Sequence, residues 1–311
     1  MSQVRDVIYR PLPDDGPLPS GAPLAESAAP PARGGVRAAA PGAGGLPERP
    51  TGVPAHAEHL TAPADGGTAL EGWRWQSDSW SAAAEAPTGW ATVRVPADVV
   101  SAPVPFVVTD VDSTLIQDEV IELLAAHAGR EAEVAEVTER AMRGELDFAQ
   151  SLHARVEALA DLPVSVVEEV VARVRPTPGA QDLIAAVTGA GGRMYAVSGG
   201  FTQVLAPLAA AWGLTGYCAN ELGVADGHLT GRVAGAVVDR AVKEQMLRQW
   251  AAEAEMPLLG TIGCGDGAND IDLLTASGCG VALCGKPALR KVADACVDVP
   301  HLAVMRWMLG L

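Results

Sequence analysis

The chain of 311 residues is 49% hydrophobic, and its formal net charge of −16 gives a sequence pI of about 4.7. Such an acidic chain, with no run of more than two Lys or Arg residues, is not expected to bind nucleic acid or anionic membranes. No apolar stretch approaches the roughly 18 residues of a membrane-spanning helix, and the first residues show no secretory signal.

The five cysteines all lie in the last third of the chain, at irregular spacings and without a C-x-x-C pair. This pattern favours neither a disulfide framework nor a zinc site. We therefore expect reduced thiols, most of them buried, in a cytoplasmic protein.

Residues 1–100 contain 14 of the 23 prolines and are rich in Ala and Gly. This composition buries too little apolar surface to offset the entropy lost on ordering, so we predict a mostly disordered N-terminal region. Two segments stand out: residues 72–80, GWRWQSDSW, concentrate tryptophan, and residues 89–100, GWATVRVPADVV, alternate as a short strand does. Either segment is a candidate to dock on the domain that follows.

The pattern changes at residue 104, where VPFVVTD indicates a strand that is buried on both faces and ends at Asp110. Residues 119–175 then show helical periodicity, and beyond them strands and helices alternate. This order predicts an α/β domain over residues 104–311, with a three-layer Rossmann-like parallel sheet. The segment 119–175 is expected to be a small helical cap inserted after the first strand.

Asp110, Ser198 and Asp266 each stand at the carboxyl end of a predicted strand, and such ends line one crevice in a parallel sheet. Asp110 with Asp112 and Asp266 with Asp270 would repel one another across this crevice unless a cation lay between them. Oxygen ligands without His or Cys nearby suit Mg²⁺. Taken alone, the Asp and Asn residues of the second loop fit a helix N-cap equally well.

The segment VSGG around Ser198 supplies a hydroxyl and two glycine amides ahead of a predicted helix. This is the outline of a phosphate cradle, although S-G-G occurs in many ordinary turns. Lys243 lies in another predicted helix and, taken alone, would be a solvated charge. Together with Mg²⁺ it would provide the fixed positive charge that a phosphoryl group needs in so acidic a protein.

Four segments in this order resemble the motifs of the haloacid dehalogenase superfamily of aspartate-nucleophile phosphatases: DVDST (110–114), SGG (198–200), Lys243 and GDGAND (265–270). The resemblance to the phosphoserine phosphatase family within it is closer and runs from Phe106 almost to the C-terminus. It includes DSTLIQDEVI, MRGELDFAQSLHARVEAL, TPGAQDLI, VSGGF, DGHLTG and GDGANDIDLL. Val111 stands where family members often carry Phe, and we expect its side chain to point into the core.

This resemblance implies a role for each motif. Asp110 would attack phosphorus and form an aspartyl-phosphate, and Asp112 would act first as an acid and then as a base. Mg²⁺ would be bound by Asp110, the backbone carbonyl of Asp112 and Asp266, with Asp270 steadying its waters. Thr114 would support these groups through its hydroxyl. The groups that would hold phosphoryl oxygens are Ser198, the Gly199 amide, Lys243 and Asn269.

In this family the helical insert covers the site and selects the substrate. Glu119 would meet the substrate ammonium and Arg155 its carboxylate, while Met142 and Phe148 would form an apolar wall. Hydrogen bonds to charged groups are worth roughly 1.5–3 kcal/mol each, so two of them would favour an amino-acid phosphate. Outside this context Glu119 and Arg155 would be ordinary helix charges, and Asp118 is interpreted as a solvated charge at a helix start.

The expected function is Mg²⁺-dependent hydrolysis of O-phospho-L-serine to L-serine and phosphate, the last step of serine synthesis. One alternative is a related phosphotransferase, or a phosphatase acting on another small phosphomonoester. Another is a non-enzymatic binding protein, which would not require the full set of acidic groups and Lys243. The first 100 residues lack the β-α-β-β-α-β pattern of the ACT-type domains of longer relatives, so feedback by serine through such a domain is not expected. The oligomeric state is left open, with a homodimer as one option.

Overall fold

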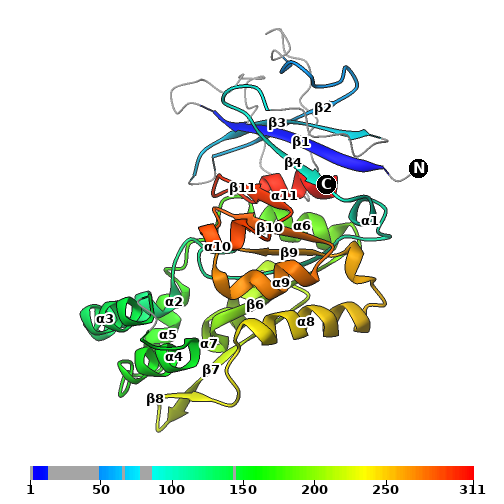
Figure 1. Ribbon diagram of the computed structural model, residues 1–311. Coiled ribbons are helices and arrows are strands. Elements are labelled where there is room, and N and C mark those ends of the chain that lie inside the picture. The colour runs from blue at the N-terminus through cyan, green and yellow to red at the C-terminus, as the bar shows by residue number, and fades with distance from the viewer. Residues whose placement is uncertain (1–2, 13–48, 65–66, 78–85, 143–144) are drawn as a thin grey trace, which may run out of the picture.

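The computed structural model describes residues 3–12, 49–64, 67–77, 86–142 and 145–311. The first part of the chain forms a four-stranded antiparallel sheet, and the rest is built around a seven-stranded sheet. Figure 1 shows the smaller sheet lying across the end of the larger domain that carries the C-terminal helix. No helix among the described residues is long and apolar enough to cross a membrane.

The larger sheet has the strand order β11-β10-β9-β5-β6-β7-β8, and its neighbouring strands are parallel except in the β7–β8 hairpin. The central strand β5 is buried over its whole length because both faces of the sheet are covered. Phe106 and Val108 belong to one hydrophobic core and Val107 to the other, as the alternation of side chains along a strand requires. The strands are β5 (Phe106–Thr109), β6 (Arg193–Phe201), β7 (Gly216–Ala225), β8 (His228–Ala234), β9 (Ile262–Gly265), β10 (Cys279–Leu283) and β11 (Ala295–Val297).

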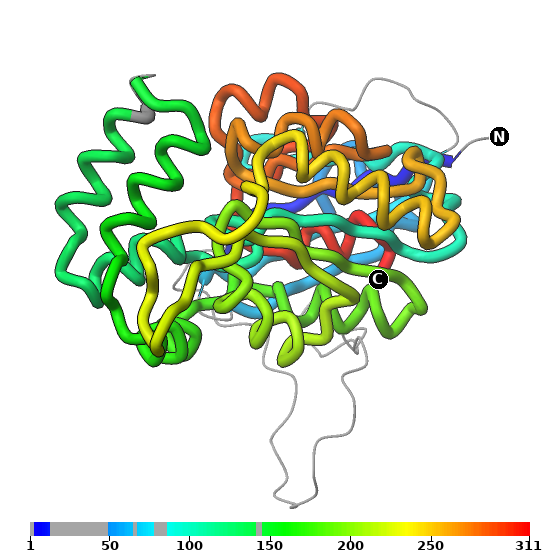
Figure 2. The backbone as a smooth tube through the Cα atoms, turned by 90° about the horizontal axis from the view of Figure 1, so that it is seen from below, coloured from blue at the N-terminus to red at the C-terminus, as the bar shows by residue number. Residues whose placement is uncertain are grey.

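Helices cover both faces of this sheet, which is therefore the middle of three layers (Figure 2). Leu247 and Trp250 of α8 and Leu273 of α9 pack in one core, and residues of α6, α7 and α11 pack in the other. The predicted three-layer α/β fold with a parallel sheet is confirmed. The helices are α6 (Ala180–Gly189), α7 (Thr202–Trp212), α8 (Arg240–Glu253), α9 (Ile271–Ala276), the short α10 (Pro287–Arg290) and α11 (Ala303–Leu309).

Four further helices lie between β5 and α6, in the segment where a helical insert was predicted. The start of α4 is fixed by a capping box, in which the Asp147 side chain accepts from the Gln150 amide and the Gln150 side chain accepts from the Asp147 amide. A backbone bond of 2.9 Å from Asp161 to Leu229 joins this cap to the β7–β8 hairpin. The four helices are α2 (Val120–Ala128), α3 (Glu131–Met142), α4 (Phe148–Glu157) and α5 (Ser165–Val171).

The prediction of a mostly disordered N-terminal region is wrong for four segments, which form the strands of the smaller sheet. Residues 13–48 and 78–85 lie outside the described residues. Its order is β2-β3-β1-β4, and every pair is antiparallel. Composition averaged over 100 residues concealed short strands whose partners lie far along the chain. The four strands are β1 (Val4–Pro11), β2 (Glu58–Ala62), β3 (Leu70–Ser77) and β4 (Ala91–Val95), and a short helix α1 (Ala97–Val100) follows them.

This N-terminal sheet packs on β11 and α11. Both candidate docking segments take part: β4 packs on β11 and α11, and Gly72 and Arg74 of β3 contact Trp307, whereas residues 78–80 lie outside the described residues. Val7 of β1 and Trp307 of α11 belong to the same core. The Arg5 guanidinium donates a 2.8 Å hydrogen bond to the Met308 carbonyl. Gly72 allows a close approach, because a Cβ at this position would lie 2.7 Å from the Trp307 ring.

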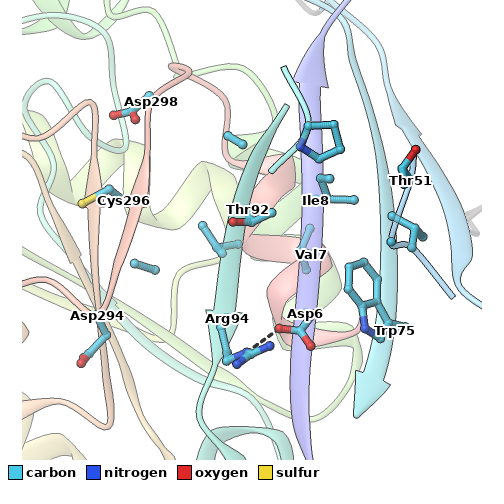
Figure 3. A pocket seen from close by; sticks show the side chains of 16 residues that line it. Asp6, Val7, Ile8, Thr51, Trp75, Thr92, Arg94, Asp294, Cys296 and Asp298 are labelled. Atoms are coloured by element: carbon cyan, nitrogen blue, oxygen red, sulfur yellow. Dashed lines mark hydrogen bonds and ion pairs between the residues drawn. The ribbon is translucent and has the colours of Figure 1, made fainter. Parts of the chain in front are cut away.

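A hollow of about 430 Å³ lies at the seam between the N-terminal sheet and β11, and Figure 3 shows its walls. Its charged groups already have partners: Asp6 pairs with Arg94 at 2.5 Å, and Asp294 accepts a 2.8 Å bond from the Gly280 amide. None of the residues that line the hollow belongs to the predicted site. The phosphate chemistry expected from the sequence must therefore be sought elsewhere, at the ends of the central strands.

Candidate active site

The carboxyl ends of β5, β6 and β9 meet at one edge of the larger sheet. Asp110 follows β5 and its amide donates a 2.8 Å bond to the Cys264 carbonyl of β9, which ties these two strand ends together. Ser198 of β6 bonds to Asp112 at 3.0 Å. The carboxylates of Asp110 and Asp266 each offer an oxygen within 4.8 Å of the other. The three strand ends therefore form one site.

Lys243 lies at the centre of this site and is only 1% exposed. Asp239 begins α8 by accepting a 3.0 Å bond from the Val242 amide, which places Lys243 in the first turn. Its ammonium lies 2.7 Å from Asp110 Oδ1 and 2.7 Å from Asp270 Oδ1. Burial lowers the pKa of Lys243, but the two ion pairs outweigh burial and raise it above its ordinary value. Lys243 is therefore a buried, fixed positive charge.

Asp110 is 3% exposed and has partners on both carboxylate oxygens. Besides Lys243, its Oδ1 accepts a 2.7 Å bond from the Val111 amide, and the Asn269 amide nitrogen lies 3.5 Å from its Oδ2. Burial and the charge of Asp270 raise the pKa of Asp110, while Lys243 opposes them. The Val111 side chain lies in the core, as expected.

Asp110, Asp266 and Asp270 form a buried acidic cluster, each with one oxygen within 4.8 Å of the others. Asp270 already has three donors: Lys243 on Oδ1, and on Oδ2 the amides of Asp266 at 3.2 Å and Gly267 at 3.1 Å. Asp270 therefore holds the loop and the lysine in place. The buried Lys243 and the largely exposed Lys286, which pairs with Asp266, do not balance three carboxylates, so Asp110 and Asp266 fit a divalent cation bound by oxygen ligands.

Asp112 has different partners although it is two residues from Asp110. Its Oδ1 accepts a 2.8 Å bond from the Val120 amide, and its Oδ2 accepts a 3.0 Å bond from the Ser198 hydroxyl. Burial raises the pKa of Asp112, and these two hydrogen bonds oppose the rise. Gly200 is needed beside it, because a Cβ there would lie 2.8 Å from Asp112 Oδ2. The Asp112 carboxylate lies outside the acidic cluster, so a metal contact from Asp112 would use its backbone carbonyl.

The S-G-G turn carries a buried hydroxyl and is covered by the cap. The Ser198 hydroxyl accepts a 2.7 Å bond from the Gly200 amide while it donates to Asp112. Phe148 of α4 lies over Gly199, since a Cβ on Gly199 would be 3.1 Å from its ring. Phe148 thus forms a wall above the turn, whereas the Met142 side chain lies outside the described part of the structure.

Glu119 and Arg155 are both partly buried and close enough to Asp112 for their charges to interact with it. The Ser113 hydroxyl donates a 2.8 Å bond to Glu119 Oε1. Burial and the charge of Asp112 raise the pKa of Glu119, and the Ser113 bond opposes them. Arg155 is partly buried, and its Nε donates a 3.3 Å bond to the Ser151 carbonyl. Burial lowers the pKa of Arg155, and the charges of Glu119 and Asp112 oppose it, so these groups are electrostatic neighbours and not solvated helix charges.

The interpretation of Asp118 as a solvated charge is wrong. Asp118 is buried and accepts three bonds from Arg175: 2.7 Å from its amide, 3.0 Å from Nε and 2.5 Å from Nη2. This ion pair joins the two ends of the cap insert. No local pattern predicts this pair, because Arg175 stands 57 positions further along the chain.

Two more polar residues of the site were not predicted from the sequence. The Lys286 ammonium lies 3.0 Å from Asp266 Oδ2, and the Lys286 amide donates a 2.8 Å bond to the Asp266 carbonyl. Asn220 of β7 is buried and bonds to the S-G-G turn. Conversely, the Thr114 hydroxyl that was expected to support the site is buried without a hydrogen-bond partner among the described residues.

Comparison with known proteins gives a family and several relatives. The model of the haloacid dehalogenase-like hydrolases matches residues 107–275. Over 205 residues the chain is 58% identical to the phosphoserine phosphatase of Streptomyces coelicolor and 49% identical to phosphoserine phosphatase SerB2 of Mycobacterium tuberculosis; each match covers 66% of this chain and 50% of the relative. It is 47% identical over 195 residues to the phosphoserine phosphatase of Streptococcus thermophilus, covering 63% of this chain and 91% of the relative. The chain therefore spans about half the length of the first two relatives.

Solved structures are similar over the same region. A substrate-bound phosphoserine phosphatase complex matches with a TM-score of 0.62 and 38% identity, covering 65% of this chain and 97% of that chain. An unliganded probable phosphoserine phosphatase from Vibrio cholerae matches with a TM-score of 0.67 and 33% identity, covering 78% of this chain and 75% of that chain. Because residues 104–311 make up about two thirds of this chain, the second match extends into the N-terminal part.

Proposed function

The chain belongs to the haloacid dehalogenase-like hydrolase family, and we propose that it is a Mg²⁺-dependent phosphoserine phosphatase that hydrolyses O-phospho-L-serine to L-serine and phosphate. The observation that carries the proposal is the different environment of two neighbouring carboxylates. Asp110 is buried against Lys243, whereas Asp112 is bound by Ser198 and a backbone amide. Two carboxylates with such different partners are suited to two different roles in one reaction. The phosphoserine phosphatases among the relatives supply the substrate class.

In the first half of the reaction Asp110 attacks phosphorus, and a bond from phosphorus to Asp110 forms as the bond to the serine oxygen breaks. Asp112 gives its proton to the departing serine oxygen, and the pKa of Asp112, raised by burial, favours the protonated form that this step needs. In the second half water attacks the aspartyl-phosphate, Asp112 takes the proton of that water, and phosphate leaves with the Asp110 carboxylate restored.

The negative charge of the phosphoryl group is met by groups at the strand ends. The Lys243 ammonium and the Asn269 amide lie beside Asp110, and the Ser198 hydroxyl bonds to Asp112. We propose that these donors, together with the Gly199 amide, hold phosphoryl oxygens. Mg²⁺ would be held by the Asp110 and Asp266 carboxylates and the Asp112 carbonyl. When bound, it supplies positive charge that polarises the phosphoryl group and offsets the acidic cluster.

Selection of an amino-acid phosphate rests on Glu119 and Arg155. We propose that Glu119, held by Ser113, binds the substrate ammonium and that Arg155 binds its carboxylate. Each group is partly buried, which strengthens a hydrogen bond to a charged partner. Phe148 would close the apolar side of the space above Gly199.

The proposed place of this reaction is the cytoplasm. All five cysteines are free, and Cys264 and Cys279 are buried. Burial raises the pKa of both thiols, which keeps them protonated and unreactive. Free thiols are the usual state of cysteine in a reducing compartment.

The test is phosphate release from phosphoserine, phosphothreonine, phosphoethanolamine and p-nitrophenyl phosphate, with Mg²⁺ and with EDTA. We expect phosphoserine to be hydrolysed fastest, EDTA to abolish the activity and Asp110→Asn to remove it. The matched control Asp182→Asn changes an exposed carboxylate on α6 and should leave the rate unchanged. Equal rates on phosphoserine and phosphoethanolamine would contradict the role of Arg155. Transfer of the phosphoryl group to an added alcohol in place of water would favour the phosphotransferase.

A further inference from the structure

Asn220 is a buried polar side chain in an otherwise ordinary sheet position. It lies in β7, the neighbour of β6 in Figure 1, and is 1% exposed. The register between these strands shifts between Val197 and Phe201, and Asn220 pairs with Phe201 where the pairing resumes. The shifted stretch is the S-G-G turn. Its backbone groups leave the ladder at this point and need other partners.

The side-chain amide of Asn220 supplies such partners through both its nitrogen and its oxygen. Its Nδ2 donates a 2.8 Å bond to the Gly199 carbonyl, and its Oδ1 accepts a 2.7 Å bond from the Val238 amide. One partner is an acceptor and the other a donor, so only one orientation of the side-chain amide satisfies both. An apolar side chain of similar size would leave two buried backbone groups unpaired.

These two backbone groups belong to the two elements that carry the phosphate-binding side chains. The Gly199 carbonyl is part of the Gly199–Gly200 peptide, whose amide bonds to Ser198. Val238 directly precedes Asp239, which caps α8, and the carbonyl of Asp239 accepts a 3.1 Å bond from the Lys243 amide. A single side chain therefore links the S-G-G turn of β6 to the first turn of α8.

Building on the proposed function, we propose that Asn220 is a positioning residue that fixes the spacing between the S-G-G turn and Lys243, so that both reach the same phosphoryl group. Preorganised donors stabilise charge only when they are held at the correct distance, and a misplacement of about 1 Å can cost on the order of 10²-fold in rate. The metal ligands at the ends of β5 and β9 make no contact with Asn220 among the hydrogen bonds of the described residues. We therefore expect loss of the Asn220 side chain to weaken phosphate binding more than Mg²⁺ binding.

Gln203 of α7 provides a matched control, because its side chain also bonds to strand β7. Its side-chain amide also makes two bonds to the backbone of β7, donating to the Leu222 carbonyl at 2.8 Å and accepting from the Leu222 amide at 3.1 Å. Gln203 links neither the S-G-G turn nor α8. Asn220→Ala and Gln203→Ala therefore remove the same kind and number of bonds, and only the first separates the phosphate-binding elements.

The experiment compares the two variants by titration of the Mg²⁺-loaded protein with inorganic phosphate, by titration with Mg²⁺ alone, and by phosphoserine kinetics. Asn220→Ala should raise the Kd for phosphate by at least about tenfold and lower kcat more than it raises KM, with the Kd for Mg²⁺ within about twofold of wild type. Gln203→Ala should change the melting temperature but keep phosphate affinity and kcat within about twofold, on the physical ground that its bonds lie outside the site.

If Asn220→Ala does not fold, Asn220→Leu serves instead, because it keeps nearly the same shape, adds no charge and loses the bonds to both Gly199 and Val238. The same weakening of phosphate binding is then expected. Equal effects of the Asn220 and Gln203 variants on phosphate affinity would overturn the inference alone. Wild-type protein that binds phosphate but does not hydrolyse phosphoserine would refute the proposed substrate alone.

Discussion

Lys243→Met should destabilise the metal-free protein strongly, because the lysine is the only side-chain cation within 4.0 Å of Asp110 and Asp270 among the described residues. Removing one partner of a buried ion pair costs roughly 3–5 kcal/mol. Here Asp110 keeps the Val111 amide and Asp270 keeps two backbone amides, so both carboxylates remain partly satisfied. We therefore expect a loss near the lower end, about 3 kcal/mol of unfolding free energy at neutral pH.

The assay is urea unfolding of wild type and variant without metal. Lys286→Met is the matched control, because its ammonium is largely exposed although it pairs with Asp266, and such a pair is worth roughly 0–1 kcal/mol. Added Mg²⁺ should recover part of the loss in Lys243→Met, since a cation between Asp110 and Asp266 relieves the same repulsion. A loss below about 1 kcal/mol, indistinguishable from the Lys286 variant, would refute the reasoning.

The loss of unfolding free energy in Lys243→Met should also depend on pH. Burial raises the pKa of Asp110 in the folded state, and loss of Lys243 removes the group that opposes this rise. The folded variant then binds a proton more readily than the unfolded chain, so its stability increases as the pH falls through the raised pKa. The difference from wild type should be largest at neutral pH and shrink under acidic conditions; a difference that grows on acidification would contradict the assignment.

Three further predictions concern single contacts. Gly200→Ala should reduce phosphoserine turnover on the order of 10²-fold, because its Cβ would meet Asp112 and Ser198. The control Gly189→Ala, whose Cβ would have nothing within 4 Å, should leave turnover unchanged. Equal rates of the two variants in steady-state kinetics would contradict the close packing at Gly200. Ser113→Ala should raise KM for phosphoserine about tenfold by freeing Glu119, without changing KM for p-nitrophenyl phosphate, and a parallel rise for both substrates would show that Ser113 acts on the phosphate site instead. Gly72→Ala should lower the unfolding free energy by about 1–3 kcal/mol through overpacking against Trp307, with kcat unchanged, and a normal melting curve would mean that the N-terminal sheet is not tightly packed on α11.

The fold class and the edge of the sheet that carries the site follow from local patterns in the sequence. The apolar run before Asp110 and the alternation of later strands and helices predict a parallel sheet, and parallel sheets place strand ends together. This rule was sufficient to bring Asp110, Ser198 and Asp266 to one edge, as the structure has them. It works because short apolar strands and their following loops are local features of the chain.

The different surroundings of the carboxylates are visible only in the folded chain. The spacing of Asp110 and Asp112 does not distinguish them, and the family resemblance supplied their separate roles. In the structure Asp110 meets Lys243 from α8, whereas Asp112 meets Ser198 from β6. Asp118 was misinterpreted for the same reason, since its partner Arg175 comes from the far end of the cap. The environment of a charge depends on residues that are distant in the sequence, and no local pattern contains them.

The formation of the N-terminal sheet and the proposed role of Asn220 likewise depend on tertiary contacts. The strand β1 is buried on both faces because Val7 packs in one core with Trp307 of α11, while Ile8 packs in another with Val53 and Ala57. Its composition does not set it apart from the surrounding region rich in Pro, Gly and Ala. Asn220 has no motif around it, and its importance comes from two unpaired backbone groups that folding brings to its side chain. Local periodicity predicts where strands and helices form, but the pairing of buried polar groups is set by which elements meet, and that is fixed only in the folded chain.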